Sequence, residues 1–395
     1  MKLLVNLNSL NYPLTGIGEY TLNLVKEILD DEQVQDIKGM RSSRYLDRHQ
    51  ISALIVSLEQ GHQTDLPLTR YLKKMNRLKL IARLARKAVF TYRDLSFRFY
   101  RNMLKHYIYW EPNYICLNHQ GVCVPTVHDL SHLLCPQFHP RERVKYLEAE
   151  LPITLARANH VIVVSEFTKQ SVMQHFDLDE QQITVVPPSV KSEYYPRSAA
   201  QCAQLKKRLS LPENFLLFVG TLEPRKNLQG LLLAYKLLPA DLRSQYPLVL
   251  SGKKGWLLEE IEQVLQPMLD SGEVIWVGYT KSEDLPALYS AATAFTYVSH
   301  FEGFGMPIAE AMASGTAVVA SDSTAMKEAA GGAVCAVSPH SIESIAQGIS
   351  KVLLDSEYRK QCEQKGLEVS GKRSWKSSKQ LLVKALSSVN KGAKI

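Results

Sequence analysis

The sequence predicts an α/β protein with two Rossmann-like domains that face a central cleft. The chain has 395 residues, which is more than a single hydrophobic core usually supports. Short apolar runs alternate with helical patterns through both halves of the chain, as in folds built on parallel sheets. Glycine-rich turns follow several of these runs, at the sheet edge where such folds bind ligands. We place the first domain at residues 1–193 and the second at residues 194–374.

The first predicted unit is a strand, a glycine loop and a helix. These occupy Lys2–Leu7, Asn8–Gly18 and Glu19–Leu29. Gly16 and Gly18 stand just before the helix, where glycines let a phosphate approach the free amides of a helix N-terminus. A single Gly-x-Gly also occurs in ordinary tight connections, so the residues alone leave both interpretations open.

Residues 69–105 are strongly basic. Twelve Lys and Arg side chains stand against Asp94 alone, whereas the whole chain has a formal net charge of +8. Apolar residues recur at spacings of three and four from Leu72 to Val89, and five aromatic residues follow from Phe90. The segment could lie on an anionic membrane, pack its apolar stripe on the domain under a solvated basic face, or bind single-stranded nucleic acid. We expect no specific nucleic-acid partner, because no RNA-module signature is present.

A histidine follows the next predicted strand. Gly121–Val127 is strand-like, so His128 and Asp129 fall at its C-terminal end, where open α/β sheets bind ligands. His128 could polarise or hydrogen-bond a reacting oxygen, although a His-Asp pair in such a place is more often structural. The same half is predicted to contain a helix at Arg143–Ala158, strands at Val161–Val164 and Ile183–Val186, and a helix cap at Ser165.

The second domain opens with a strand and a basic loop. The strand is Phe215–Val219, and Arg225 and Lys226 lie in the loop before a helix that begins near Leu228. Two fixed cations after a strand could offset the charge of a diphosphate, although basic loop residues are usually only solvated. Further elements are predicted at Leu248–Ser251 and Val274–Val277, which read as strands, and at Asp284–Ala291, which reads as a helix.

Residues 294–320 are the most informative stretch. They read as a strand at Ala294–Val298, a glycine turn, a helix through residues 307–313 and a strand at Thr316–Ala320. Glu302 stands before the turn, and Glu310 lies about one turn into the helix. A glycine loop at a helix N-terminus binds anions, and a carboxylate can accept two sugar hydroxyls. A phosphate and a polyol could therefore be bound close together, which describes a sugar nucleotide.

The same stretch resembles a known family. Residues 302–315 resemble the E-x7-E signature of retaining glycosyltransferases of family 4, which have the GT-B fold. This resemblance implies that Glu302 lies near the transferred sugar and that Glu310 binds the nucleotide ribose. It also implies that the amides of three residues hold the diphosphate, namely Gly303, Phe304 and Gly305.

The resemblance extends to other parts of the chain. Residues 15–20 resemble the family's glycine loop, which implies that Gly16 and Gly18 face the cleft. His128 resembles the histidine that mannosyltransferase-like members place beside the donor sugar. Residues 219–227 resemble the phosphate-binding loop, although Thr221 stands where many members carry arginine, so we favour Lys226 over Arg225 as the direct phosphate ligand. In this fold the last helix returns to the first domain, which we expect of residues 375–395.

Composition excludes several other classes of protein. Six scattered cysteines without a C-x-x-C pair argue against a zinc ribbon and a disulfide scaffold, and suit a reducing compartment. No segment reads as a signal peptide or a transmembrane helix, and no metal-binding constellation emerges. We therefore expect a metal-independent, cytoplasmic protein without a cofactor, which could be peripheral on the inner face of the membrane.

The expected function is transfer of a sugar from a nucleoside-diphosphate sugar with retention of configuration. The resemblance implies mannose from GDP-mannose, passed to a glycan or lipid-linked acceptor in cell-surface polysaccharide or glycolipid synthesis. His128, Glu302 and Lys226 would form the catalytic set. One alternative is a transferase of the same fold that uses UDP-glucose or another sugar nucleotide. Another is a membrane- or nucleic-acid-binding protein on an inactive transferase scaffold.

Overall fold

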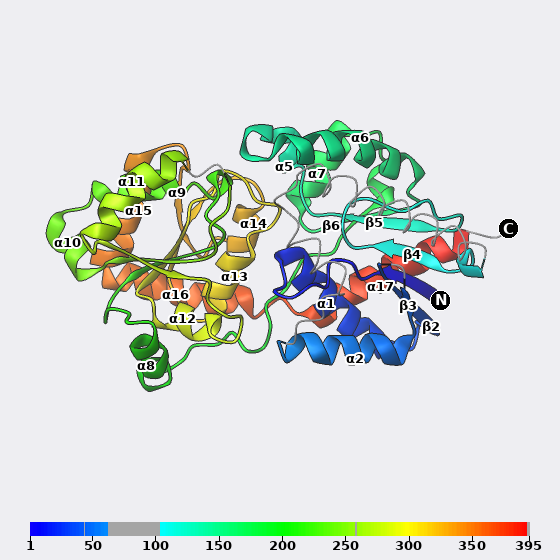
Figure 1. The fold of residues 1–395 in the computed structure, drawn as a ribbon, viewed down its shortest axis with the longest axis horizontal. Helices are drawn as coiled ribbons and strands as arrows, with labels where there is room; N and C mark the ends of the chain where they lie inside the picture. The colour runs from blue at the N-terminus through cyan, green and yellow to red at the C-terminus, as the bar shows by residue number, and fades with distance from the viewer. Residues whose placement is uncertain (43, 62–102, 257–258, 393–395) are drawn as a thin grey trace, which may run out of the picture.

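Two Rossmann-like halves, each a parallel sheet covered by helices, make up the protein (Figure 1). The computed structural model describes residues 1–42, 44–61, 103–256 and 259–392. Most of the basic segment 69–105 therefore lies outside the described residues. The sheets confirm the predicted fold class, an α/β protein with two Rossmann-like halves.

The first half is built on a seven-stranded sheet in the order β3-β2-β1-β4-β5-β6-β7. All neighbours are parallel except β2 and β3. Its strands are β1 (Lys2–Asn6), β2 (Asp36–Arg41), β3 (Arg44–Leu46), β4 (Ile108–Glu111), β5 (Cys123–Val127), β6 (Val161–Val163) and β7 (Ile183–Val185). The central strands are buried on both faces because helices cover both sides, as expected for a parallel sheet, although β4 ends in the buried Glu111.

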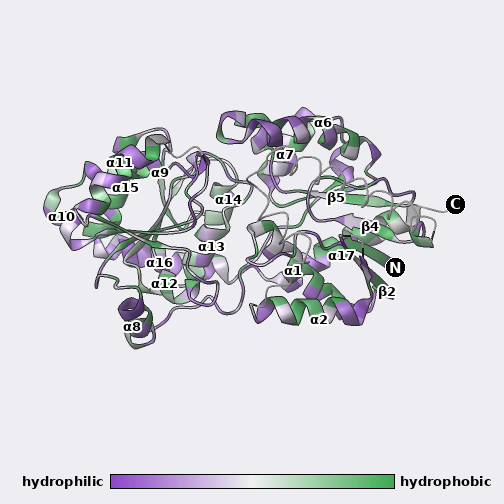
Figure 2. Cartoon of the chain, viewed as in Figure 1, coloured by the Kyte–Doolittle hydropathy of each residue, from purple (hydrophilic) through white to green (hydrophobic). Residues whose placement is uncertain are grey.

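The second half is built on a parallel six-stranded sheet in the order β10-β9-β8-β11-β12-β13. Its strands are β8 (Leu216–Val219), β9 (Leu248–Ser251), β10 (Val274–Gly278), β11 (Ala294–Tyr297), β12 (Val318–Ser321) and β13 (Cys335–Val337). Each agrees in place with a strand expected from the sequence, apart from β13, which was not predicted. Figure 2 shows that the strands are largely hydrophobic and that α8 (Ala199–Arg208), at the edge of the molecule, is largely hydrophilic.

Helices connect the parallel strands in both halves. The first half contains α1 (Gly16–Leu29), α2 (Arg48–Glu59), α5 (Ser131–Leu134), α6 (Arg141–Arg157) and α7 (Glu166–His175), with the 3-10 turns η1 (Pro136–Phe138) and η2 (Glu180–Gln182). Besides α8, the second half contains η3 (Pro224–Lys226), α9 (Leu228–Lys236), α10 (Ala240–Gln245), α11 (Glu259–Asp270), α12 (Leu285–Ala291), α13 (Met306–Ala313), α14 (Met326–Ala330), α15 (Ile342–Leu354) and α16 (Ser356–Ser370). Within the described ranges, no helix is both long and apolar enough to cross a bilayer.

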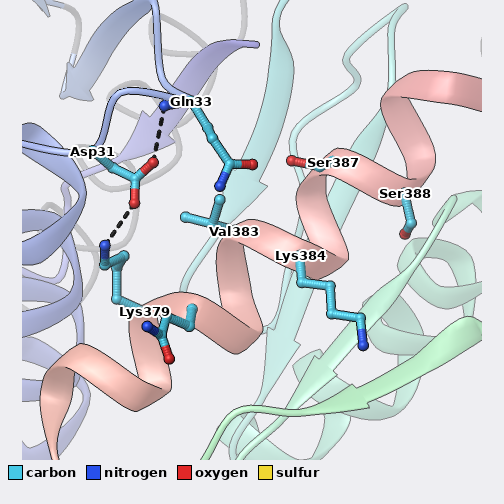
Figure 3. A pocket seen from close by; sticks show the side chains of 8 residues that line it. Asp31, Gln33, Lys379, Val383, Lys384, Ser387 and Ser388 are labelled. Atoms are coloured by element: carbon cyan, nitrogen blue, oxygen red, sulfur yellow. Dashed lines mark hydrogen bonds and ion pairs between the residues drawn. The ribbon is translucent and has the colours of Figure 1, made fainter.

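The chain passes between the halves twice. It crosses first between β7 and α8, in the segment that holds the expected boundary at residue 193. It crosses back between α16 and α17 (Trp375–Gly392), and α17 packs against α1 and β7 (Figure 1). Lys379 on α17 donates to the Asp31 carboxylate at 2.6 Å, which ties the helix to the first half (Figure 3). The Ser378 hydroxyl donates to the Pro187 carbonyl at 2.6 Å, so the first turn of α17 is joined to the first crossing segment.

Candidate active site

The loop between β11 and α13 carries both predicted glutamates at the carboxyl edge of the second sheet. β11 is a central strand, and its last residue, Tyr297, is followed by the loop to Gly305. Gly305 precedes α13 with φ +104°, a left-handed conformation that favours glycine. The helix therefore begins at Met306, one residue before the predicted start, with Pro307 in its first turn. Pro307 has no N–H, and the Ile308 amide donates to the Gly305 carbonyl oxygen at 3.0 Å, so an anion at this helix start would meet the Met306 amide and those of the preceding loop.

Gly303 lies against the other half of the molecule. A Cβ atom at this position would be 2.0 Å from the His128 carbonyl oxygen, so any other residue would push the two halves apart. The sequence predicted Gly303 as a phosphate-approach residue, and the structure supplies a second, steric reason for a glycine here. The contact brings the β11–α13 loop beside the carboxyl end of β5.

A 3-10 turn positions the two predicted cations. Arg225 and Lys226 belong to η3, and Asn227 follows in a left-handed conformation with φ +55°. The side-chain amide of Asn227 donates to the carbonyl oxygens of Val298 and Pro339, at 3.0 and 2.8 Å, and the residue is 5 % exposed. These bonds fix the turn to the end of β11, so both cations point toward the Glu302 loop.

Glu302 lies between these two cations. Its Oε2 is 2.9 Å from an Arg225 guanidinium nitrogen, and its Oε1 is 2.5 Å from Lys226 Nζ. Arg225 also pairs with Glu223 at 2.8 Å. Burial alone would raise the pKa of Glu302, but the two cations outweigh burial and hold the pKa below its ordinary value. Burial lowers the pKa of Lys226, although Glu302 opposes this effect. The result is a buried, charge-balanced cluster whose cations suit a diphosphate.

Glu310 lies on α13 itself, in a different environment. Its Oε2 accepts a hydrogen bond from the Tyr289 hydroxyl at 3.0 Å. Burial raises the pKa of Glu310 to about 7, and the nearby Glu19 acts in the same direction while Lys191 opposes it. Glu19 and Lys191 pair with each other at 2.6 Å. Glu310 can therefore change protonation near neutral pH, which Glu302 cannot.

His128 follows β5 on the facing half, as predicted. Its Nε2 lies 2.7 Å from the Pro112 carbonyl oxygen, and a carbonyl oxygen only accepts, so Nε2 carries a proton. Burial lowers the pKa of His128, although the Pro112 carbonyl and Asp129 oppose this effect. A neutral His128 then offers Nδ1 as an acceptor. The ring is therefore suited to accept from a sugar hydroxyl, rather than to polarise an oxygen by donating to it.

The predicted glycine loop of the first half belongs instead to a helix. α1 begins at Gly16, three residues before the predicted start, because the Thr15 side chain caps it by accepting from the Gly18 amide at 3.3 Å. A Cβ on Gly18 would lie 2.9 Å from the Ser9 carbonyl oxygen, so Gly18 is required by packing. Gly16 is exposed, and a Cβ added there would meet no other atom within 4 Å, so packing does not require a glycine at this position.

Further contacts join the two halves beside these residues. The Glu328 carboxylate, at the start of α14, accepts from the amides of Glu166 and Phe167 at 2.8 and 2.5 Å. These amides open α7, so an acid of one half caps a helix of the other. The Thr168 hydroxyl lies 3.4 Å from the carbonyl oxygens of both His128 and Gly303. The structure therefore brings His128 of the first half beside the β11–α13 loop of the second, whereas Gly16 and Gly18 precede Glu19, which lies near Glu310.

Comparison with known proteins identifies the family. Residues 43–194 match the family described as Glycosyltransferase Family 4, and residues 203–369 match Glycosyl transferases group 1. Over 381 residues the chain is 34% identical to the O-antigen chain mannosyltransferase B of Escherichia coli, a match that covers 95% of this chain and 97% of that protein. The chain is a GT-B glycosyltransferase.

Other relatives agree with this assignment. The glycosyltransferase is 30% identical over 275 residues to the serotype-specific mannosyltransferase WbdA of Escherichia coli, covering 68% of this chain and 32% of WbdA. Its fold is similar to that of Anabaena Alr3699/HepE, solved in complex with UDP and glucose, with a TM-score of 0.71, 18% identity, and coverage of 98% and 100% of the two chains.

Sequence reasoning missed three contributors to the site of this glycosyltransferase. Tyr297 contacts Lys226 and Glu302, Glu223 pairs with Arg225, and Tyr289 binds Glu310. Tyr297 could have been suspected, because it is the last residue of a strand whose carboxyl end was expected to face the ligand. Nothing local in the sequence marks the other two. In the part of the chain that the structure describes, no cluster of three or more His, Cys, Asp or Glu could hold a metal ion.

Proposed function

We propose that this glycosyltransferase transfers mannose from GDP-mannose to a glycan or lipid-linked acceptor with retention of configuration, in the synthesis of a cell-surface polysaccharide or glycolipid. The observation that carries the proposal is the Arg225–Glu302–Lys226 cluster at the N-terminus of α13, facing His128. The choice of mannose rests on the names of its relatives, which include O-antigen chain mannosyltransferases of Escherichia coli and Salmonella typhimurium.

The diphosphate would bind beside the cations. The amides of Gly303, Phe304 and Gly305, in the loop before α13, would hold its oxygens together with Arg225 and Lys226. As the bond from the sugar to the diphosphate breaks, the sugar becomes oxocarbenium-like and the diphosphate gains charge. Fixed cations and amides stabilise that charge without reorganising, which lowers the barrier.

The rest of the donor would extend on either side of the diphosphate. Glu302 would accept hydrogen bonds from hydroxyls of the transferred sugar, once the diphosphate shares its cations. Glu310, one turn further along α13, would accept from the ribose hydroxyls. His128 would contact the sugar from the first half, and the Gly16 amide would approach the donor from the start of α1.

A donor panel tests this proposal. The protein would be incubated with GDP-mannose, UDP-glucose, UDP-galactose and UDP-N-acetylglucosamine, and release of nucleoside diphosphate would be followed with and without mannose-terminated oligosaccharides. We expect turnover with GDP-mannose, and product NMR should show an α-linkage, like that in the donor. A preference for a UDP-sugar would favour the alternative donor class, and a β-linked product would exclude retention. No turnover with any donor and acceptor would favour an inactive scaffold.

We also propose that residues 69–105 dock the enzyme on an anionic membrane, near a lipid-linked acceptor. The support is their composition, since each basic residue near an anionic surface contributes about 1 kcal/mol. Co-sedimentation with phosphatidylglycerol vesicles should exceed that with neutral vesicles and should weaken at high salt. Changing Lys73, Lys74, Arg77, Arg83, Arg86 and Lys87 to glutamine should abolish it. Equal binding to both vesicles would leave only a solvated basic face.

A further inference from the structure

We propose that Tyr297 is a positioning residue that fixes the Lys226 ammonium for the departing diphosphate; this inference rests on the function proposed above. Tyr297 is the last residue of β11 and is 1 % exposed. Its hydroxyl oxygen lies 2.5 Å from Lys226 Nζ and 3.1 Å from Glu302 Oε1. The Tyr297 hydroxyl therefore bridges the ammonium and the carboxylate.

The direction of each hydrogen bond is determined by chemistry. Burial and the neighbouring Glu302 raise the pKa of Tyr297 well above its ordinary value, so the hydroxyl keeps its single hydrogen. A carboxylate only accepts and an ammonium only donates. The Tyr297 O–H therefore donates to Glu302, and its oxygen accepts from Lys226.

This arrangement leaves one donor of Lys226 for a ligand. Of the three ammonium N–H groups, one is directed to Glu302 and one to Tyr297. When a donor sugar draws Glu302 away, the cation loses its carboxylate partner. Tyr297 remains, because it is neutral and fixed in a central strand. Lys226 is thus kept in place and oriented while the diphosphate gains charge.

The test removes only the hydroxyl. In Tyr297→Phe we expect kcat to fall about 10- to 100-fold, the range for loss of a hydrogen bond to a charged group, while the KM for the donor changes much less. The matched control is Tyr235→Phe on α9. The Tyr235 hydroxyl is also buried, and its one hydrogen can be donated to a carbonyl oxygen of Arg243, Tyr246 or Glu273, which lie 3.1, 3.2 and 3.2 Å away and outside the cluster. This control should lose stability but keep the wild-type kcat.

Two readouts distinguish positioning from a structural role. Loss of an acceptor lowers the pKa of an ammonium, so the basic limb of the pH–kcat profile should move to lower pH in Tyr297→Phe. In a double-mutant cycle, Tyr297→Phe should reduce kcat in the wild-type background and have no further effect in Lys226→Ala. The same cycle can be measured without turnover, as the affinity for free GDP and UDP by calorimetry. Free nucleoside diphosphate carries the charge that the leaving group gains, so Lys226 should bind both.

The outcomes separate this inference from the proposed function. A wild-type kcat in Tyr297→Phe, or losses that add fully to those of Lys226→Ala in both cycles, would overturn the positioning role. A wild-type protein that binds nucleoside diphosphate but transfers no sugar would contradict the proposed function alone, and the binding cycle would still decide the role of Tyr297. A wild type that binds neither GDP nor UDP would overturn both.

Discussion

Glu302 lies in the loop before α13 and Glu310 lies in the helix, and their surroundings shift the two pKa values in opposite directions. Glu302 faces the cations of Arg225 and Lys226, and its pKa lies below the ordinary value. Glu310 faces the Tyr289 hydroxyl and has a pKa raised to about 7 by burial. The difference shows that two identical side chains, eight residues apart, ionise in different pH ranges because their neighbours differ. Glu302 is paired with two cations, whereas Glu310 is hydrogen-bonded to a neutral tyrosine hydroxyl.

Removing the cation beside Glu302 should have the largest effect. Lys226→Ala should lower turnover about 10²- to 10³-fold, as for loss of one preorganised donor at a developing charge. The fold should be affected less, because Arg225 still pairs with Glu302. Arg225→Ala should lower turnover less but stability more, since Arg225 also binds Glu223 and the Phe301 carbonyl. Steady-state kinetics and thermal unfolding of both variants check this, and equal turnover of Lys226→Ala and wild type at saturating donor would refute it.

The two glutamates should respond oppositely when free nucleoside diphosphate is titrated. Glu302→Gln removes the carboxylate that competes for Arg225 and Lys226, so the affinity for GDP should rise severalfold while transfer falls. Glu310→Ala removes the expected ribose partner, so the affinity should fall about tenfold. Calorimetry measures both. The comparison fails if Glu302→Gln loses affinity while Glu310→Ala keeps it.

The pH dependence of nucleotide binding should come from Glu310. A carboxylate must be ionised to accept two ribose hydroxyls, and the pKa of about 7 places that ionisation near neutrality. Affinity for GDP should therefore rise about tenfold from pH 6 to pH 8, as the ionised fraction rises by about that factor. Glu310→Gln serves as the control, because the phosphate of GDP still titrates in this variant whereas residue 310 does not. An identical pH dependence in the variant and the wild type would exclude this role.

Stability should depend on pH with opposite sign at the two sites. The folded pKa of Glu310 is raised, so its contribution is present below about pH 4.5 and is lost as the pH rises through about 7. The folded pKa of Glu302 is lowered, so its contribution is present above about pH 4.5 and is lost as the pH falls. As the pH rises, the difference in melting temperature between the wild type and Glu302→Gln should therefore change in the opposite direction from that between the wild type and Glu310→Gln, by a few degrees in each case. Parallel changes would show that the two environments are alike.

The sequence predicted the parts of this site that depend on local pattern. The strand, glycine turn and helix around Glu302 and Glu310 follow from apolar runs and helix-start residues within one short stretch. The start of α1 was missed because the capping side chain of Thr15 was not weighed against the glycines after it. The contact of Gly303 with His128, and the bonds of Tyr297, join residues far apart in the chain or on different elements. No periodicity or composition encodes such contacts, so they needed the structure.

The paired crossings between the halves have a mechanical consequence. Ser378, in the first turn of α17, donates to the carbonyl oxygen of Pro187, in the segment by which the chain leaves the first half. Arg373, in the second connection, donates to the carbonyl oxygens of Glu328 and Ala329 on α14. The side chain of the same Glu328 caps α7 of the first half. A substitution at Arg373 would therefore disturb the crossing and the cap between the halves together.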